Sequence, residues 1–483
     1  MMAADRELAI GLDVGTGGAR AVAVALDGTL VAEGRAPLPT EAMRVDGPRV
    51  EQDPQAWIRA AEDALGRMIE RLPRPHRVIG VSVDATSGTF LLVDAQHRPL
   101  TAGIMYNDQR ATDVVDEVAE SLGPDLQPYG IRIAASFALA KLVHWTRHEP
   151  SIWQQAARVV HQTDWIVGML CGRYDVTDVS TALKTGVDPG RLAWPEAIER
   201  LGVPTDCLPQ VVLSGTIIGE VTEEASERTG LPAGTPVIAG CTDGTAGCLA
   251  SGAKHVGDLN VTLGTTLVFK AIAETPLQDP EGVLYNHRHP AGGYLPGAAS
   301  STGGEWIDRW FAGQDLQDLN RQARSLVPTG RTVYPLIKSG ERFPFACPEA
   351  RGFGLEEIED QVERFAAGLE GVAFLERMGV ERLERLGLTV GPVVYATGGG
   401  AAGTTWLTIR AAVNRRTYWV PEHPECAMGA AILAATPFLG SCQAAIARLV
   451  RTGQSIEPDP RLAAAYEEPF GRFRTSLQER GWL

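Results

Sequence analysis

The stretch DVGTGGAR, residues 13–20, decides how the first part of this chain is interpreted. It follows an apolar run, Leu8–Leu12, and a second apolar run, Ala21–Ala25, comes directly after it. Short apolar runs on both sides of a glycine-rich turn predict two strands of a β-hairpin. The glycines let backbone N–H groups approach an anion, and Thr16 adds a hydroxyl donor. The Walker A lysine is missing, and a strand rather than a helix follows, so neither a P-loop nor a dinucleotide-binding turn is predicted.

The same pattern returns in the second half of the chain. Asp258–Leu263 and Leu267–Ala271 are predicted strands, and Gly264, Thr265 and Thr266 form the turn between them. We interpret this as an internal duplication, although two unrelated hairpins would give the same pattern. We therefore expect two α/β domains, residues 1–250 and 251–483, whose Gly-Thr loops hold a polyphosphate from both sides of a cleft. Pro392–Ala396 is predicted to be the last buried strand.

Composition excludes several classes of protein. Of the 483 residues, 44% are hydrophobic and 21% are charged, which is typical of a globular protein. The net charge of −15 argues against a broad nucleic-acid or membrane surface, although a small anion can still bind to backbone N–H groups. The seven cysteines contain no CxxC pair, and neither a signal peptide nor a long apolar segment is evident. We therefore expect a cytoplasmic protein without nucleic-acid or membrane partners.

Acidic residues follow several of the predicted strands. Asp13 ends a buried strand, where a carboxylate needs a cation or hydrogen bonds. Asp243, in GCTDGTAG, has small neighbours that leave room for a ligand, and it could take the proton of a hydroxyl that attacks phosphorus. A helix N-cap is the structural alternative for Asp243.

Three further polar or glycine-rich loops follow strands. Asn107 and Asp108, in MYNDQR, suit a polyhydroxylated ligand, and VDATSG at 83–88 is a similar polar loop. TGGGAAG at 397–403 would let a base or ribose lie against the backbone. A polar turn or a close packing turn would explain each loop equally well. His161, His255, His287 and His289 do not have a metal-binding spacing.

Taken together, these motifs resemble the FGGY carbohydrate kinases over about residues 7–450. The resemblance implies two actin-like (ribonuclease H-like) domains with an ATP-binding cleft between them. Several separate motifs in the same order make it specific. They are GLDVGTGGARA (11–21), VEQDPQAW (50–57), MYNDQR (105–110), GCTDGTAG (240–247), LGTTL (263–267), LEGVAF (369–374) and TGGGA (397–401).

The resemblance also assigns roles to individual residues. It implies that Asp243 is the catalytic base and that Asp13 holds Mg²⁺. It implies a sugar site that includes Asp84, Thr86, Ser87, Asn107, Asp108 and Asp243. The residues expected to bind ATP are Asp13, Gly15, Thr16, Gly18 and Arg20 in the first loop, Gly264, Thr265 and Thr266 in the second, and Gly399, Gly400 and Ala401 in the adenosine loop.

Departures from the family pattern narrow the expected substrate. Xylulokinases usually carry Gln-Met-His-Gly in the loop matched by VDATSG and a Trp where this chain has Tyr106. The chain looks most like the xylulokinase-like D-ribulose kinases, so we expect phosphorylation of D-ribulose at O5. D-xylulose or another polyol or ketose is the alternative within the family, and an actin- or chaperone-like nucleotide-switch ATPase is the alternative of another class. The sequence leaves the oligomeric state open, a homodimer included. A stretched KLxW motif runs from Lys141 to Trp145, and Gly403, Thr404 and Thr405 stand where the adenosine motif often continues to an Asn.

Overall fold

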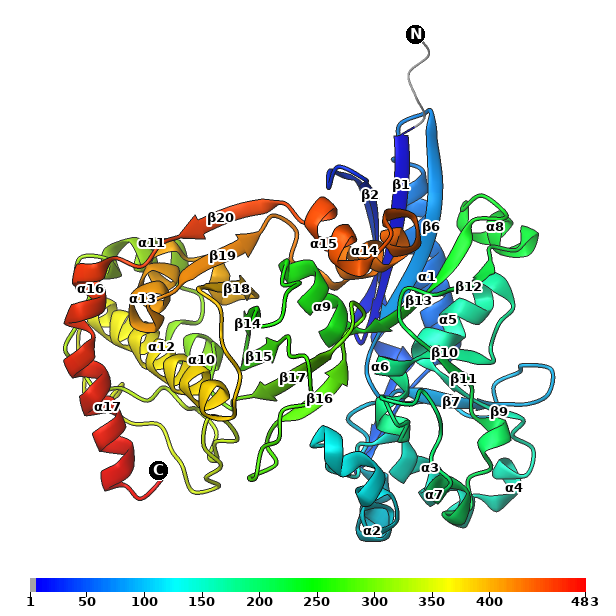
Figure 1. The fold of residues 1–483 in the computed structure, drawn as a ribbon, viewed down its shortest axis with the longest axis horizontal. Helices are drawn as coiled ribbons and strands as arrows, with labels where there is room; N and C mark the ends of the chain where they lie inside the picture. The colour runs from blue at the N-terminus through cyan, green and yellow to red at the C-terminus, as the bar shows by residue number, and fades with distance from the viewer. Residues whose placement is uncertain (1–5) are drawn as a thin grey trace. The chain divides into compact units, whose positions relative to one another are not determined.

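The computed structural model describes residues 6–483, which form two compact units (Figure 1). The first unit holds the chain up to Ala250 together with two later segments, His287–Gly293 and Glu425–Arg451. The second unit holds Ser251–Asn286, Tyr294–Pro424 and Thr452–Leu483. Residues far apart in the sequence therefore contribute to one core, and the orange segment 425–451 packs with the blue N-terminal strands.

The first unit is built on a six-stranded mixed sheet. The hairpin strands β1 and β2 are antiparallel, whereas β6 is parallel to β1 and β13 is parallel to β6. Parallel neighbours place their carboxyl ends at one edge of the sheet. In sheet order the strands are β12 (Ile217–Glu220), β13 (Pro236–Thr242), β6 (His76–Ala85), β1 (Arg6–Gly15), β2 (Gly18–Ala25) and β3 (Leu30–Pro37).

Helices cover both faces of this sheet. Side chains alternate along each strand, so apolar residues point to both faces and each face needs a cover. Leu8, Ile10 and Leu12 of β1 belong to the core cluster that includes α1 (Pro54–Ile69), and Ala9 belongs to the cluster that includes α14 (Cys426–Leu439). Asp53 caps α1 and accepts a hydrogen bond from the backbone N–H of Gln55. Both faces are apolar, so the strands read as nearly continuous hydrophobic runs.

Smaller elements complete the first unit. A five-stranded sheet contains β4 (Met43–Asp46), β5 (Arg49–Gln52), β8 (Gly103–Ile104), β7 (Phe90–Val93) and β9 (Arg158–His161), and β10 (Val176–Asp178) pairs with β11 (Gln210–Val212). The helices are η1 (Thr40–Ala42), η2 (Arg110–Val114), α2 (Val115–Leu126), η3 (Gln127–Tyr129), α3 (Ala138–His148), α4 (Pro150–Trp153), α5 (Gln162–Cys171), α6 (Val179–Ala182), η4 (Leu183–Thr185), α7 (Ala197–Arg200), η5 (Thr205–Cys207), α8 (Glu223–Thr229), α9 (Asp243–Ser251) and α15 (Cys442–Leu449).

The second unit repeats the strand order of the first. Its hairpin, β14 and β15, corresponds to β1 and β2, and the parallel strands β18 and β19 correspond to β6 and β13. The antiparallel outer strands β17 and β20 correspond to β3 and β12. This agreement supports an internal duplication. In sheet order the strands are β16 (Tyr285–Arg288), β17 (Tyr294–Ala299), β15 (Leu267–Ala271), β14 (Leu259–Leu263), β18 (Val393–Thr397), β19 (Thr417–Pro421) and β20 (Thr452–Ile456).

Several strands of the second unit, among them β17, β19 and β20, were not predicted from the sequence. The strand predicted at Pro392–Ala396 is present as β18, and two further strands that are less buried, β19 and β20, follow it. Both are only partly buried. β20 carries polar residues at most positions and forms no apolar run, whereas the hydrophobic run of β19 is limited to Tyr418–Val420.

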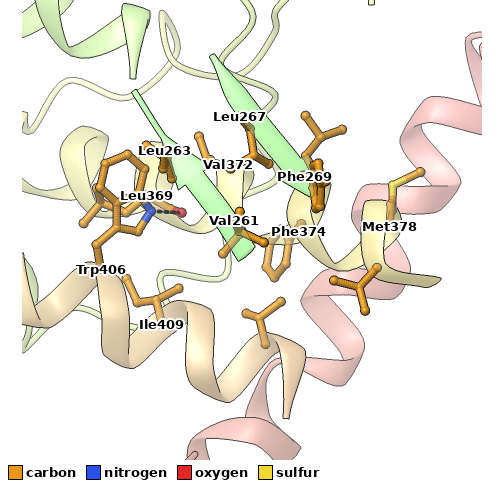
Figure 2. Packing of buried hydrophobic residues seen from close by; sticks show 14 of the residues in the cluster. Val261, Leu263, Leu267, Phe269, Leu369, Val372, Phe374, Met378, Trp406 and Ile409 are labelled. Carbon is orange, nitrogen blue, oxygen red and sulfur yellow. Dashed lines mark hydrogen bonds between the residues drawn. The ribbon is translucent and has the colours of Figure 1, made fainter. Parts of the chain in front are cut away.

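The core of the second unit lies between its sheet and the 25-residue helix α12 (Gln361–Arg385). Figure 2 shows Trp406 of α13 (Thr404–Asn414) beside Leu369, whose carbonyl accepts a hydrogen bond of 3.1 Å from the indole Nε1. No helix within residues 6–483 has both the length and the apolar composition needed to cross a membrane. The remaining helices are α10 (Glu305–Phe311), α11 (Leu316–Ala323), η6 (Gly399–Ala401), α16 (Pro460–Ala465) and α17 (Glu467–Glu479).

A buried ion pair joins α12 and α13 inside this core. Arg410 Nε and Nη2 lie 2.7 and 3.0 Å from the two carboxylate oxygens of Glu376, and both side chains are completely buried. The Tyr418 hydroxyl donates a third hydrogen bond to Glu376, at 2.7 Å. Removal of one partner would leave an unpaired charge in an apolar core.

We predict that Arg410→Met destabilises the second unit by about 3–5 kcal/mol, the usual effect of leaving a buried charge unpaired. The double variant Arg410→Met/Glu376→Met removes both charges and should recover most of this loss. Urea unfolding followed by tryptophan fluorescence would measure the change in midpoint. Equal midpoints for the wild type and Arg410→Met would contradict the prediction.

Candidate active site

Three aspartates meet at the carboxyl ends of three adjacent strands in the first unit. Asp13 of β1 is directly opposite Asp84 of the parallel strand β6. Asp243 comes directly after β13, whose Cys241 pairs with Asp84. The sheet topology therefore brings together carboxylates that are separated by many residues in the sequence.

This cluster concentrates negative charge out of water. Asp84 is completely buried, and neither of its carboxylate oxygens accepts a hydrogen bond from an N–H or hydroxyl group among residues 6–483, so the Asp13 carboxyl beside it is its polar neighbour. Burial, followed by the charges of Asp13 and Asp243, raises the pKa of Asp84 well above its ordinary value. Burial also raises the pKa of Asp13 to about 6. A shared proton or a bound cation satisfies such a pair, so the donor set fits a hard divalent ion such as Mg²⁺.

Cys426 is a fourth member of the cluster, and the sequence analysis did not identify it. Single ligand atoms of Asp13, Asp84 and Cys426 all lie within 4.8 Å of one another. The Cys426 thiol donates to the main-chain carbonyl of Asp243 at 3.3 Å. Burial is the main reason why the pKa of this thiol lies above its ordinary value. The residue is at the start of α14, far along the chain, and an isolated cysteine gave no sequence signal.

The first glycine-rich loop is held next to Asp13. Its Thr16 carbonyl accepts a hydrogen bond of 3.0 Å from Gln52 Nε2. A side chain at position 18 would meet the Ala36 carbonyl oxygen at 2.6 Å, so this contact requires Gly18. Gly15 and Gly17 complete the turn between β1 and β2. The backbone N–H groups of such a turn can donate hydrogen bonds to phosphate oxygens.

Arg20 is opposite Asp13 on β2 and is already paired with carboxylates. Its guanidinium lies 2.8 Å from Glu33 and 3.1 Å from Glu425. The second ion pair connects β2 to the segment before α14, which carries Cys426. A direct contact between Arg20 and phosphate stays a prediction.

The loop that follows β6 contains the expected sugar-binding residues Thr86 and Ser87. The Thr86 hydroxyl donates to Gln162 Oε1 at 2.6 Å and also contacts the Thr89 hydroxyl. Ser87 Oγ is buried without a hydrogen-bond partner among the described residues, so it is the hydroxyl of this loop with spare capacity. Asn107, on the next polar loop, is exposed.

Asp108 differs from its neighbour Asn107, because its carboxylate is fully occupied. One oxygen accepts from the Val50 backbone N–H at 2.7 Å, and Arg110 donates to both oxygens. The side chain is completely buried. This geometry indicates that Asp108 holds the loop in place. It does not favour the direct contact with substrate that was expected from the sequence.

Lys141 connects the two polar loops. Its Nζ donates to the Gly88 carbonyl at 2.9 Å and to the Met105 carbonyl at 2.7 Å, and the side chain is completely buried. Burial lowers the pKa of this lysine to about 7. A second lysine, Lys184, donates to the Ser87 carbonyl at 3.1 Å. Lys141 appeared in the sequence only as part of the stretched KLxW motif, which gave no indication of this role.

Asp243 is positioned by a buried network behind it. Asp178 accepts a hydrogen bond of 2.6 Å from Ser180 Oγ, which in turn accepts one of 3.0 Å from the Thr242 backbone N–H. Asp243 Oδ1 accepts a hydrogen bond from the Gly244 backbone N–H at 2.6 Å. Asp243 is the first residue of α9. It therefore stands at the start of a helix and is also a member of the carboxylate cluster.

The second unit brings its own two glycine-rich loops together. Gly264, Thr265 and Thr266 connect β14 to β15, and the Gly264 carbonyl accepts from the Gly304 backbone N–H at 2.8 Å. Cβ atoms at Gly398 and Gly400 would meet Leu263 atoms at 2.5 and 2.4 Å. The loop that includes Gly399 and Ala401, which is expected to bind adenosine, therefore packs directly against the end of β14, next to the second Gly-Thr loop.

A cavity of about 490 Å³ opens beside the adenosine loop. It is lined by Gly399, Gly403 and Thr404, and by residues of α10, α11 and α13 that include Leu316 and Trp406. Asn320 Oδ1 of α11 would lie 2.7 Å from a Cβ atom at position 403, so the Asn320 side chain lies directly against Gly403. The size and mixed lining of the cavity suit a nucleoside.

Comparison with known proteins agrees with this arrangement. Residues 8–250 match the N-terminal domain and residues 259–437 the C-terminal domain of the FGGY family of carbohydrate kinases. A xylulose kinase from Bacillus subtilis is 26% identical, over 96% of this chain and 95% of the relative. An autoinducer-2 kinase from Yersinia pseudotuberculosis is 30% identical, over 88% of this chain and 84% of the relative.

The fold expected from the sequence is confirmed by solved structures. The crystal structure of a xylulose kinase from Rhodospirillum rubrum has a TM-score of 0.85 at 26% identity, and the match covers 98% of both chains. The two actin-like (ribonuclease H-like) α/β domains are therefore present. The chain belongs to the FGGY family of carbohydrate kinases and is an ATP-dependent sugar kinase.

Proposed function

We propose that this kinase transfers the γ-phosphoryl group of ATP to O5 of a ketopentose, and that the ketopentose is D-ribulose. The observation that carries the proposal is the meeting of Asp13, Asp84 and Asp243 at the carboxyl ends of β1, β6 and β13. Phosphoryl transfer to a sugar needs a base, a cation site and hydroxyl acceptors in one place. This cluster supplies carboxylates for all three.

Within this proposal the residues divide the work. Asp243 orients the attacking hydroxyl and takes its proton, and the hydrogen-bonded chain through Thr242 fixes its position. Asp13 holds Mg²⁺, which supplies charge neutralisation at the phosphate oxygens when bound. The backbone N–H groups of residues 15–18 and 264–266 bind phosphate oxygens, and the cavity beside Gly399 takes the adenosine.

The sugar is held by groups that the protein leaves available. Ser87 Oγ and the two Asp84 oxygens are buried without partners among residues 6–483, and a ligand hydroxyl could bind to each. Asn107 adds an exposed amide. Thr86 and Asp108 hold these loops in place through Gln162 and Arg110.

D-xylulose is the second candidate, because relatives that match nearly the whole chain are xylulose kinases. D-ribulose is placed first because the loop at residues 83–88 reads VDATSG and contains neither His nor Met. The two ketopentoses differ in the configuration of one hydroxyl. A site with buried hydrogen-bonding groups can discriminate strongly against a misplaced hydroxyl.

We predict that kcat/KM for D-ribulose exceeds that for D-xylulose by about tenfold or more, which corresponds to at least about 1.4 kcal/mol. ADP release with Mg-ATP would be measured across ketopentoses, aldopentoses, pentitols and glycerol. A higher value for D-xylulose would overturn the assignment of D-ribulose. Equal ADP release with and without sugar would instead support a nucleotide-switch ATPase.

We predict that Asp243→Asn lowers sugar-dependent kcat by about 10²–10⁴, the usual contribution of a general base. The amide keeps the size of the side chain, so the circular dichroism spectrum and the unfolding midpoint should stay close to wild type. Asp27→Asn is a matched control, because Asp27 is an exposed aspartate in a β-turn. Wild-type turnover by Asp243→Asn would show that another group takes the proton.

We predict that Lys141→Met raises KM for the sugar by about tenfold, because two hydrogen bonds of about 1 kcal/mol each no longer hold the sugar loops. KM for ATP should change little, because both carbonyls that accept from this lysine, those of Gly88 and Met105, lie in the loops proposed to bind the sugar. Lys141→Arg keeps donors for both carbonyls and should recover part of the loss. Equal increases in both KM values would indicate general damage to the fold rather than loop positioning.

A further inference from the structure

A second group of metal-ligand side chains lies outside the carboxylate cluster, on the surface of the first unit. His144 and His148 are one turn apart on α3, so their rings lie on the same side of the helix, with centroids 4.2 Å apart. Asp113 of η2 contacts both rings. Its Oδ1 lies 2.9 Å from His144 Nδ1, and its Oδ2 lies 2.8 Å from His148 Nε2.

We propose that Asp113, His144 and His148 bind a divalent transition-metal ion, and that Zn²⁺ is the ion they fit. One ligand atom from each residue lies within 4.8 Å of the other two. Zn²⁺ accepts imidazole nitrogen and carboxylate oxygen at about 2.0–2.2 Å, which places tetrahedral ligands about 3.4 Å apart. A small opening of the present hydrogen bonds therefore admits the ion, and water completes the coordination.

The surroundings of the site leave it open to an ion from solution. The His148 and Asp113 side chains are 52% and 46% exposed, whereas His144 is 13% exposed and is held by the helix. Arg147 of α3 and Glu117 of α2 pair with each other, so neither charge is directed at the site. Two imidazoles and one carboxylate are a ligand set that Zn²⁺, Ni²⁺ and Cu²⁺ bind far better than Mg²⁺.

The site joins two segments that are connected to the sugar loops. η2 begins at Arg110, whose guanidinium holds Asp108, and α3 carries Lys141. A metal ion bound across Asp113 and the two histidines would link η2 to α3 near both loops. An ion that binds the folded state and not the unfolded chain stabilises the fold by mass action. Metal binding here should therefore raise the melting temperature.

The test compares Zn²⁺ binding by the full-length wild type and by His144→Ala/His148→Ala, measured by calorimetry with excess Mg²⁺ present to occupy hard-cation sites. We expect the wild type to bind one more equivalent of Zn²⁺ than the double variant, or to bind it at least tenfold more tightly, and to gain melting temperature on adding Zn²⁺. Asp113→Asn should weaken the same binding event. Arg147→Gln is the matched control and should bind Zn²⁺ like the wild type.

The same stoichiometry, affinity and melting shift in the wild type and the double variant would overturn the proposal. That result would leave Asp113, His144 and His148 as a hydrogen-bonded surface group. His148 is exposed, His144 is partly buried, and the buried apolar face of α3 is unchanged in the variants, so folding is not expected to fail. Neither outcome depends on which sugar is phosphorylated, because binding and melting are measured without substrate.

Discussion

The placement of the partly buried Asp13 beside the completely buried Asp84 is the constraint on which the rest of the first unit depends. Their strands are parallel neighbours in register, so the two carboxyls cannot separate without breaking the sheet. Isolated buried carboxylates are strongly unfavourable, and a like-charged neighbour adds to the penalty. The fold tolerates this arrangement because helices on both faces of the sheet, α1 and α14, fix β1 and β6 through a large apolar core. A ligand or cation that relieves the unfavourable charge therefore has a ready-made binding site.

Around this pair, buried side chains hold the polar loops in place through hydrogen bonds. Lys141 binds main-chain carbonyls of both sugar loops, and Asp108 binds a main-chain N–H of β5 and the side chain of Arg110. These buried groups satisfy each other and leave Ser87 Oγ and the Asp84 oxygens unpaired among residues 6–483. A site built in this way has its polar groups fixed before the substrate arrives, which reduces the reorganisation needed for binding and transfer.

The sequence predicted those parts of the site that local pattern determines. Asp13, Asp84 and Asp243 each follow an apolar run, and the glycine-rich loops are recognised by their composition. The role of Asp108 depends on Arg110 turning back onto it, and that of Lys141 on two carbonyls from distant loops, so neither could be read from spacing. His144 and His148 do have a readable i, i+4 spacing, but the contribution of Asp113 comes from the packing of η2 against α3. β20 was missed because it is polar at most positions, and β19 was missed because its hydrophobic run is only three residues long.

The two units show how one supersecondary arrangement can carry different chemistry. When the hairpins are aligned on their Gly-Thr turns, Asp13 corresponds to Thr262, and its neighbour Asp84 corresponds to Thr397, which pairs with Thr262 in the parallel ladder. The threonine hydroxyls lie 2.7 Å apart and satisfy each other. The second unit therefore has a neutral, internally paired position where the first has two carboxyls in need of a partner. Because a satisfied pair has no excess charge to offer a cation, the chemistry is expected to be concentrated in the first unit, while the second unit contributes backbone loops and a nucleoside-sized cavity.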